Sequence, residues 1–424
     1  MKGEGELKME SVIRKLTKEE LGDLWEIKVS SFPGFGYSRE QKEAQVNAFS
    51  RSMDESENSA FYGMFREEKL LGIMALLDFR IKLLSTAADM GGVGMVSVDF
   101  LHKKEKVAMD MISFFINHYR EKGVSLVALY PFRTDFYRNM GFGYGAKIHQ
   151  YRIKPDSFPK GKSKENIDYI SPDEKQAMLQ CYNRYQQKTN GLIEKALSWL
   201  DYAFGPNMRV VGYKKDGKIL GYIVFSFKST QAGYDFMNDM FIHEFVYETP
   251  EALMELCTFL HSQSDQINRV IVKSMDDNFH YIIGNPENGC NDAFNTLYQE
   301  AYVTGIGVMY RVVNVKGIFK DLCGHNFNGQ SCKLKITVKD NFLKSNDGSI
   351  FVEFKDGKAE VREDGDFEAE IIMSISDFSS MIMGAIDFKS LYRYGLASVS
   401  DCEYIDVVNR TFQYEQKPVC SNHF

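Results

Sequence analysis

Residues 95–112, MVSVDFLHKKEKVAMDMI, decide how the first part of the chain folds. Positions 96–98 alternate as a β-strand does, whereas the apolar positions of 107–112 recur at the spacing of one helix face. The basic segment HKKEK, residues 102–106, joins the strand to the helix. Its lysines oppose the helix dipole, at about 0.3 to 1 kcal/mol for each exposed charge. The pattern leaves two interpretations, an anion-binding site or a solvated turn.

The composition is that of a globular protein with several hydrophobic cores. With 424 residues, of which 44% are hydrophobic and 26% charged, we expect two to four domains. No apolar stretch is long enough to cross a bilayer and the N-terminus has no apolar signal region, so we expect a cytoplasmic protein with no membrane partner.

The cysteine spacing bears on disulfides and metal sites, and the net charge bears on the kind of binding partner. The seven cysteines never form a C-x-x-C spacing, so neither a disulfide framework nor a structural metal site is indicated. A net charge of -7 argues against a nucleic-acid partner and favours cationic small molecules.

A strand-and-helix pattern occurs twice along the chain. REEKLLGIMALLDF (66–79) and KKDGKILGYIVFSF (214–227) share a turn, a Leu-Gly pair and a strand, and residues 241–263 again read as strand, turn and helix. We therefore predict tandem α/β units over 1–160 and 161–309. Residues 310–424 predict an α+β module with a hairpin turn at Asp-Gly 356–357.

The two units differ at the join between strand and helix. In place of HKKEK the second unit has the acidic turn YETPEA, residues 247–252, with a proline near the helix start. An anion site is implausible there. We expect the second unit to be structural, or to supply one wall of a pocket.

Four segments of the first unit resemble the GNAT superfamily of N-acetyltransferases. They are the strand 96–98, KKEKVA at 103–108 in the place of the family's R/Q-x-x-G-x-G/A, the strand VSLVALY at 124–130, and FYRNMGF at 136–142, which is similar to F-Y-x-x-x-G-F. The resemblance implies acetyl-CoA as co-substrate. The residues implied to bind it are Val96, Ser97, Val98, Lys103, Lys104, Glu105, Lys106, Val107, Ala108, Met109, Phe132 and Arg133.

The whole-chain plan resembles the enhanced intracellular survival (Eis) family. That resemblance implies an α/β (α+β) fold in which tandem GNAT-like acetyltransferase domains, the second degenerate, precede a sterol-carrier-protein-like domain. It also implies acetylation of the amines of a cationic, aminoglycoside-like or polyamine-like acceptor, and assembly as a homo-oligomer, a hexamer.

Two proton-transfer residues follow from this resemblance. Tyr137 corresponds to the family's general acid, and a phenol of pKa about 10 can protonate a departing thiolate of pKa about 8.5. The carboxylate of Phe424 corresponds to the proton acceptor; an α-carboxyl is a weak base, so we expect it to orient the ammonium and relay its proton through water. The aromatic loop that contains Phe32 and Phe35 is read from its own residues: it either walls an acceptor pocket or caps the first helix. On the acceptor side we expect Phe32, Phe35 and His423.

Lys106 departs from the GNAT pattern, because the family has glycine at this position of the loop. A long side chain stands where the backbone approaches phosphate oxygens. We expect Lys106 to lie beside a CoA phosphate.

Two other functions remain possible for the protein as a whole. One is a non-catalytic protein that binds an apolar ligand or CoA on a degenerate scaffold, and the other is a protein-lysine acetyltransferase.

Overall fold

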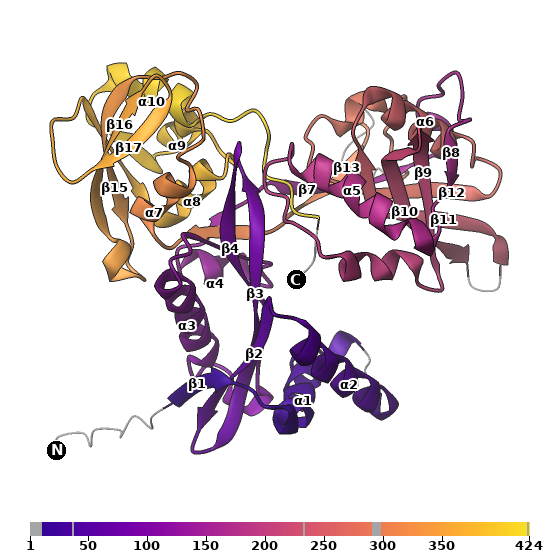
Figure 1. Ribbon diagram of the computed structural model, residues 1–424, viewed down its shortest axis with the longest axis horizontal. Helices are drawn as coiled ribbons and strands as arrows, with labels where there is room; N and C mark the ends of the chain where they lie inside the picture. Colours follow the sequence, from indigo (N-terminus) through magenta and orange to yellow (C-terminus); the bar gives the residue numbers. More distant parts are fainter. Residues whose placement is uncertain (1–10, 36–37, 232–233, 291–297, 422–423) are drawn as a thin grey trace.

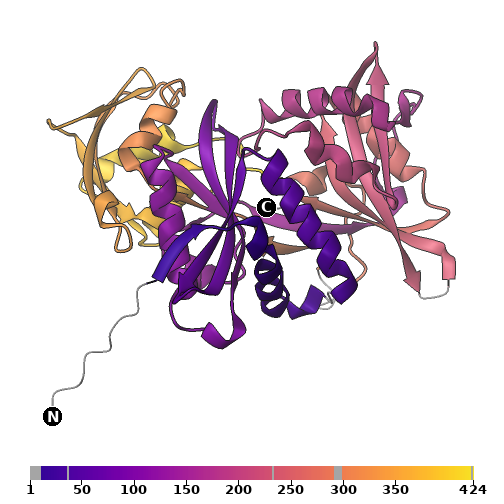
Figure 2. The ribbon, with the colours of Figure 1, turned by 60° about the horizontal axis from the view of Figure 1, so that its bottom comes forward.

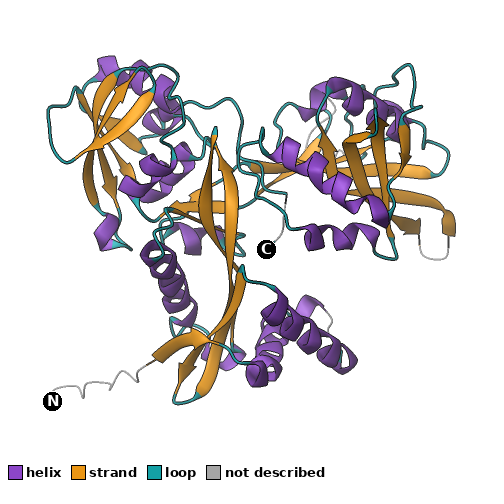
Figure 3. Cartoon of the chain, in the orientation of Figure 1, coloured by secondary structure: helices purple, strands orange, loops and turns teal. Residues whose placement is uncertain are grey.

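The computed structural model describes residues 11–35, 38–231, 234–290, 298–421 and 424, and it contains three separate β-sheets (Figure 1). Helices pack against each of the sheets (Figure 3). We refer to the bodies built on these sheets as the first unit, the second unit and the third domain. Across the described ranges, no helix combines the length and the apolar character needed to span a membrane.

The first unit is a seven-stranded sheet in the order β1-β2-β3-β4-β5-β14-β6. Its strands are β1 (Ser11–Lys15), β2 (Ser59–Arg66), β3 (Lys69–Leu83), β4 (Thr86–Val98), β5 (Leu126–Leu129), β6 (Gly143–Tyr144) and β14 (Met309–Val312). Its helices are α1 (Leu21–Ser31), α2 (Arg39–Glu55), α3 (Val107–Glu121) and α4 (Thr134–Arg138). The apolar stripe of α3, with Met111, Phe115 and Tyr119, packs against β4 and β5 as one core, which confirms the predicted strand-join-helix.

The second unit repeats this arrangement in the order β13-β7-β12-β11-β10-β9-β8. Its strands are β7 (Lys147–Ile153), β8 (Ile167–Tyr169), β9 (Met208–Lys215), β10 (Lys218–Gln231), β11 (Tyr234–Tyr247), β12 (Ile267–Ser274) and β13 (Tyr302–Ile306), and its helices are α5 (Lys175–Gln186) and α6 (Pro250–His261). As β4 does with β5, β11 pairs in parallel with β12 after an intervening helix. The internal repeat predicted from the sequence is therefore present in the sheets.

The two units exchange one strand with each other. β7 inserts between β12 and β13 in the second sheet, and β14 inserts between β5 and β6 in the first. The linear boundaries 1–160, 161–309 and 310–424 therefore do not coincide with the sheets. Hydrophobic periodicity identifies a strand but not the sheet in which it pairs, and for this reason the sequence pattern missed the exchange.

The third domain is a five-stranded sheet in the order β17-β16-β15-β18-β19. Its elements are β15 (Cys332–Lys339), β16 (Gly348–Lys355), β17 (Lys358–Arg362), β18 (Ala369–Ser374), β19 (Ala397–Val399), α7 (Val315–Asp321), α8 (Ile375–Ile382), α9 (Phe388–Arg393) and α10 (Ile405–Phe412). Asp356 and Gly357 both have positive φ and form the predicted hairpin turn. All eight residues of α8 are buried, and α8 packs against β14 and β6 of the first unit.

His325 joins the third domain to the first unit. Its Nδ1 lies 2.7 Å from the Ser85 hydroxyl, and burial lowers the pKa of His325 from 6.5 to about 4. Between about pH 6.5 and 4 the unfolded chain therefore binds a proton that the folded protein excludes, so the free energy of unfolding falls as the pH falls. We expect His325→Gln to lose less thermal stability than wild type between pH 7.5 and 5.0. An equal fall in melting temperature between pH 7.5 and 5.0 in the two proteins would contradict this.

Candidate active site

The parallel strands β4 and β5 separate halfway along β4. They pair only from Met90 to Val93, opposite the four residues of β5, and β4 then continues alone on this edge to Val98. Met95 has a φ of 53°, and the register with β3 shifts at this point, so that β4 contains a β-bulge just after its pairing with β5 ends. The edge of β4 over residues 94–98 is thus open where β5 has ended.

The open edge presents backbone N–H groups. Asp99 donates its N–H to the carbonyl of Leu71 at 2.8 Å, next to the end of β3. Because successive residues of a strand direct their N–H groups to opposite sides, the N–H groups of Val98 and Val96 point away from β3 into the opening. Such N–H groups are suited to hydrogen-bond a carbonyl oxygen that gains negative charge during a reaction.

Helix α3 begins beyond the open edge with unpaired N–H groups. Its N-cap, Lys106, provides no side-chain hydrogen bond, and the first backbone bond of the helix runs from Asp110 N–H to the Lys106 carbonyl at 2.9 Å. The N–H groups of residues 107–109 therefore have no acceptor within the helix. An uncapped N-terminus with neighbouring lysines is suited to bind a phosphate.

Lys106 has the backbone conformation that glycine adopts most readily. Its φ is 66°, and Lys104 has a φ of 69°. Glu105 turns away to Arg66, at 2.7 Å, and to His102, at 3.2 Å. Lys104 and Lys106 are exposed, with no ion pair recorded to any described residue. The loop thus keeps the glycine geometry and leaves two cations beside the helix end.

If the loop binds acetyl-CoA as the resemblance implies, we expect Lys106→Gly to raise the dissociation constant for acetyl-CoA about two- to fivefold, because a cation beside a bound phosphate contributes roughly 0.3 to 1 kcal/mol. Isothermal titration calorimetry measures this change. Lys122→Ala, at the other end of α3, is the control and should leave the affinity unchanged. Tighter binding by Lys106→Gly would mean that the lysine blocks the site.

The second unit has a similar opening, but its helix is capped. β11 pairs with β12 only as far as Phe241 and then continues to Tyr247. The Thr249 hydroxyl accepts the N–H of Ala252 at 3.2 Å, and Pro250 has no N–H to offer. The acidic turn therefore lacks the free donors that α3 has.

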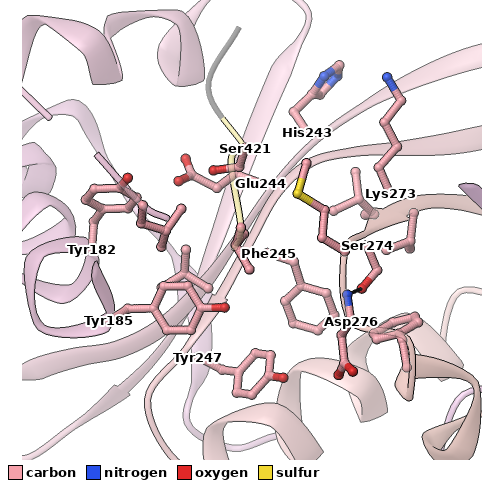
Figure 4. A pocket seen from close by; sticks show the side chains of 17 residues that line it. Tyr182, Tyr185, His243, Glu244, Phe245, Tyr247, Lys273, Ser274, Asp276 and Ser421 are labelled. Atoms are coloured by element: carbon pink, nitrogen blue, oxygen red, sulfur yellow. Dashed lines mark hydrogen bonds between the residues drawn. The ribbon is translucent and has the colours of Figure 1, made fainter. Parts of the chain in front are cut away.

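The opening of the second unit forms a cavity of about 130 Å³ (Figure 4). Phe279 lines it, eight positions after the last paired residue of β12, whereas Tyr137 stands eight positions after the last paired residue of β5. Val419 and Ser421 of the C-terminal segment also line this cavity. The second unit thus has an apolar ring where the first has a phenol.

Tyr137 lies on the α3 face of the first sheet. It belongs to the cluster that includes Val96, Val98 and Val107, and only 2% of the residue is exposed. Burial raises the pKa of Tyr137 well above 10, so the phenol stays protonated at neutral pH. No hydrogen bond to its hydroxyl is recorded from any described residue, which leaves that proton available.

Phe424 lies on the opposite face of β4. Its ring centroid is 4.8 Å from that of Phe79 and 5.2 Å from that of Tyr130. A Cβ placed on Gly94 would lie 2.8 Å from the carbonyl carbon of Phe424, and one on Gly92 would lie 3.2 Å from its ring. These two glycines leave the space in which the last residue lies. Tyr137 and Phe424 therefore lie on opposite faces of the first sheet, and Phe424 lies beside Gly94, where the open edge starts.

The segment before Phe424 is held by both units. The Tyr130 hydroxyl donates to the carbonyl of Cys420 at 3.1 Å, and Val419 N–H donates to the carbonyl of Asn190 at 2.7 Å. Asn190 is fully buried, and its side chain also bonds to Leu84 and Met383. The C-terminus accordingly lies between the first and second units (Figure 2).

The predicted acceptor-side residues, and the two predicted cofactor-binding residues before α4, lie in several different places. Phe32 directly follows Ser31, whose hydroxyl donates to the carbonyl of Val98 at 2.9 Å, so the turn 33–35 starts beside the open edge. Of Phe35 the structure describes only the backbone, in that turn, and His423 lies outside the described residues. The exposed Phe132 ring lies 5.6 Å from that of Tyr137, and Arg133 pairs with Asp135.

Trp199 is a site residue that the sequence patterns missed. It comes from the short helix Leu197–Phe204 of the second unit, and its ring lies 6.0 Å from that of Phe79, which contacts Phe424. Trp199 is 38% exposed. The sequence contains only two tryptophans, and this rarity is the one feature of the sequence that could have drawn attention to Trp199. The second unit thus supplies an aromatic wall next to the C-terminus.

No group of three or more His, Cys, Asp or Glu side chains within the described ranges is arranged to hold a metal ion. Family models match three stretches of the sequence. An acetyltransferase (GNAT) domain model matches residues 12–145, a second one matches 191–311, and a sterol carrier protein domain model matches 320–421. No curated protein matches the chain by sequence.

Several solved structures share the arrangement over 98% of this chain and 100% of their own. They are a GCN5-related N-acetyltransferase from Anabaena variabilis (20% identity, TM-score 0.79), a GCN5-related N-acetyltransferase from Kribbella flavida (14%, 0.77) and Eis1 from Mycobacterium abscessus (16%, 0.75). At such identities the likeness establishes the fold. The chain consists of two GNAT acetyltransferase domains that exchange a strand, followed by a sterol carrier protein domain.

Proposed function

We propose that the protein is an acetyl-CoA-dependent N-acetyltransferase of the Eis type that acetylates amines of a cationic acceptor, and that the first unit is the active one. One observation carries the proposal. The open edge of β4 leads to the uncapped end of α3 with its exposed lysines, and Tyr137 and Phe424 lie on opposite faces of the sheet that contains β4. The second unit has a similar opening, but Phe279 stands at the position equivalent to Tyr137 and the helix end is capped.

In the proposed reaction, the acceptor amine approaches from one face of β4 and the thiolate of CoA leaves on the other. On the Phe424 face, the carboxylate orients the acceptor ammonium and takes up its proton through water, while Phe79 and Trp199 enclose the acceptor. The N–H groups of Val96 and Val98 bind the thioester oxygen as the amine nitrogen attacks the carbonyl carbon. The C–S bond then breaks, and Tyr137 gives its phenolic proton to the departing thiolate on the α3 face. The acetylated nitrogen loses its extra proton to solvent, and solvent returns a proton to the Tyr137 phenolate.

Binding of acetyl-CoA is the first test of this proposal. A ligand present at 100 times its dissociation constant stabilises the folded protein by about 2.7 kcal/mol. We expect acetyl-CoA to raise the melting temperature of the wild type measurably. Replacing Lys103, Lys104 and Lys106 by alanine should reduce this rise, whereas replacing Lys160 and Lys162, which lie outside the first sheet, should not. No shift at millimolar acetyl-CoA would exclude the enzyme.

Two alternatives differ in the acceptor and in the ligand. A protein-lysine acetyltransferase would use the same residues but would prefer a lysine peptide over a free polyamine. A carrier of apolar ligands would need space in the third domain, where the side chains of α8 fill the region between its sheet and β14.

We further propose, on the resemblance alone, that the protein is cytoplasmic and hexameric. Light scattering measures the number of subunits in the assembly.

A further inference from the structure

Helix α4, which carries Tyr137, is too short to hold its own position. It has five residues, Thr134–Arg138, and an isolated helix of this length is not stable in water. Its position must therefore come from contacts with other elements. The third domain, which neither the open edge nor the phosphate loop uses, makes contacts at the C-terminal end of α4.

The first contact is an ion pair between α4 and α8. Arg138 Nη2 lies 2.7 Å from the Asp377 carboxylate, whose side chain is 7% exposed. The other carboxylate oxygen of Asp377 accepts the Ser374 hydroxyl at 2.6 Å, which fixes the carboxylate on α8. The Ser376 hydroxyl also donates to the carbonyl of Arg138, at 3.3 Å. One turn of α8 thus holds both the side chain and the backbone of Arg138.

The second contact lies at the turn after α4. Arg311 of β14 donates from Nη1 to the carbonyl of Met140 at 2.5 Å, and from Nη2 to Asp340 of the third domain at 2.7 Å. The side chains of Arg311 and Asp340 are both fully buried. Gly141, with a φ of 84°, leaves the space for this guanidinium, because a side chain there would overlap it.

Asp340 is itself held in place. Its Oδ1 accepts the N–H groups of Phe342 and Leu343, at 3.2 and 2.9 Å, and its Oδ2 accepts the amide of Asn346 at 3.2 Å. The two carboxylates of the third domain are therefore rigid, and each reaches the α4 segment through one arginine.

We propose that the third domain positions the general acid, through an acid-helix clamp made of Arg138, Asp377, Arg311 and Asp340. These four are positioning residues, because none of them reaches the open edge. The proposal rests on the proposed function of Tyr137. It gives the sterol-carrier-like domain a second role beside the placement of Phe424, so that both faces of the site depend on this domain.

The kinetic test breaks the α4–α8 contact from either side. We expect Asp377→Ala and Arg138→Ala each to lower kcat about 10- to 100-fold, since small displacements of a catalytic group have effects of this size. The KM for acetyl-CoA should stay within about twofold, because the open edge and the loop 103–106 are untouched. Asp366→Asn is the matched control: it breaks the exposed Lys333–Asp366 ion pair of the same domain and should leave kcat unchanged.

A double-mutant cycle separates positioning from general damage. If Asp377 acts through Tyr137, adding Asp377→Ala to Tyr137→Phe should lower kcat by less than about twofold. Full additivity of the two effects would overturn the proposal. So would a loss of kcat in Asp377→Ala that is matched by an equal rise of KM.

Hydrogen exchange gives a readout that does not need turnover. In Asp377→Ala we expect faster amide exchange over residues 134–142 and unchanged exchange over 107–121 of α3. Unchanged exchange over 134–142 would overturn the clamp, whatever the activity. A wild type that transfers no acetyl group, with exchange altered as expected, would refute the proposed function and leave the mechanical clamp standing.

Discussion

Tyr137→Phe lowers kcat about 10²- to 10⁴-fold, the usual contribution of a positioned general acid, and leaves the affinity for acetyl-CoA unchanged. The reason is that the phenol is buried and protonated, and its hydroxyl makes no hydrogen bond to any described residue, while the groups proposed to bind phosphate lie on α3 and its loop. Phenylalanine keeps the ring contacts with Phe136 and Phe142 and removes only the proton donor.

Steady-state kinetics over a series of pH values measures this effect. Tyr119→Phe is the matched control, since Tyr119 is also buried against the first sheet but lies on α3, away from the open edge. The control should retain kcat within a fewfold. Equal turnover by Tyr137→Phe and wild type would remove Tyr137 from the mechanism.

Two glycines added after Phe424 lower kcat about 100-fold, because the carboxylate can no longer occupy its place against Gly94. The ring of Phe424 would still pack on Phe79 and Tyr130, so we expect the melting temperature to change little. Steady-state kinetics gives kcat, and the same two glycines added before residue 1 serve as the control. Full activity of the extended protein would exclude the carboxylate.

Gly94→Val tests the same position from the other side. The new side chain would occupy the space of the Phe424 carbonyl carbon, 2.8 Å from its Cβ, and should displace the last residue. We expect a loss of kcat similar to that caused by the extension, and little further loss when both changes are combined. Independent losses would mean that Gly94 acts in some other way.

The sequence predicted the parts of this molecule that depend on local pattern. Periodicity located the strand at 96–98 and α3, the internal repeat identified two similar sheets, and the Asp-Gly pair at 356–357 marked a hairpin. HKKEK precedes an uncapped helix and YETPEA a capped one, and the anion site expected at the first join remains a prediction. All of these features are set by neighbours along the chain.

Features set by distant contacts were beyond the sequence patterns. The exchange of β7 and β14 depends on which sheet a strand joins, and the space that Gly92 and Gly94 leave for Phe424 depends on a residue more than 300 positions away. Lys106 departs from the GNAT pattern in residue type, and its backbone has the left-handed conformation that glycine favours.

Release of CoA from acetyl-CoA, measured with a panel of amines, tests the central claim most directly. The panel would hold a monoamine, a linear polyamine, an aminoglycoside and a lysine peptide. The proposed mechanism predicts faster release with the linear polyamine or the aminoglycoside than with the monoamine or the lysine peptide, intersecting initial-velocity lines from a ternary complex, and loss of release in Tyr137→Phe. No release with any amine, or parallel lines from an acetyl-enzyme, would contradict it.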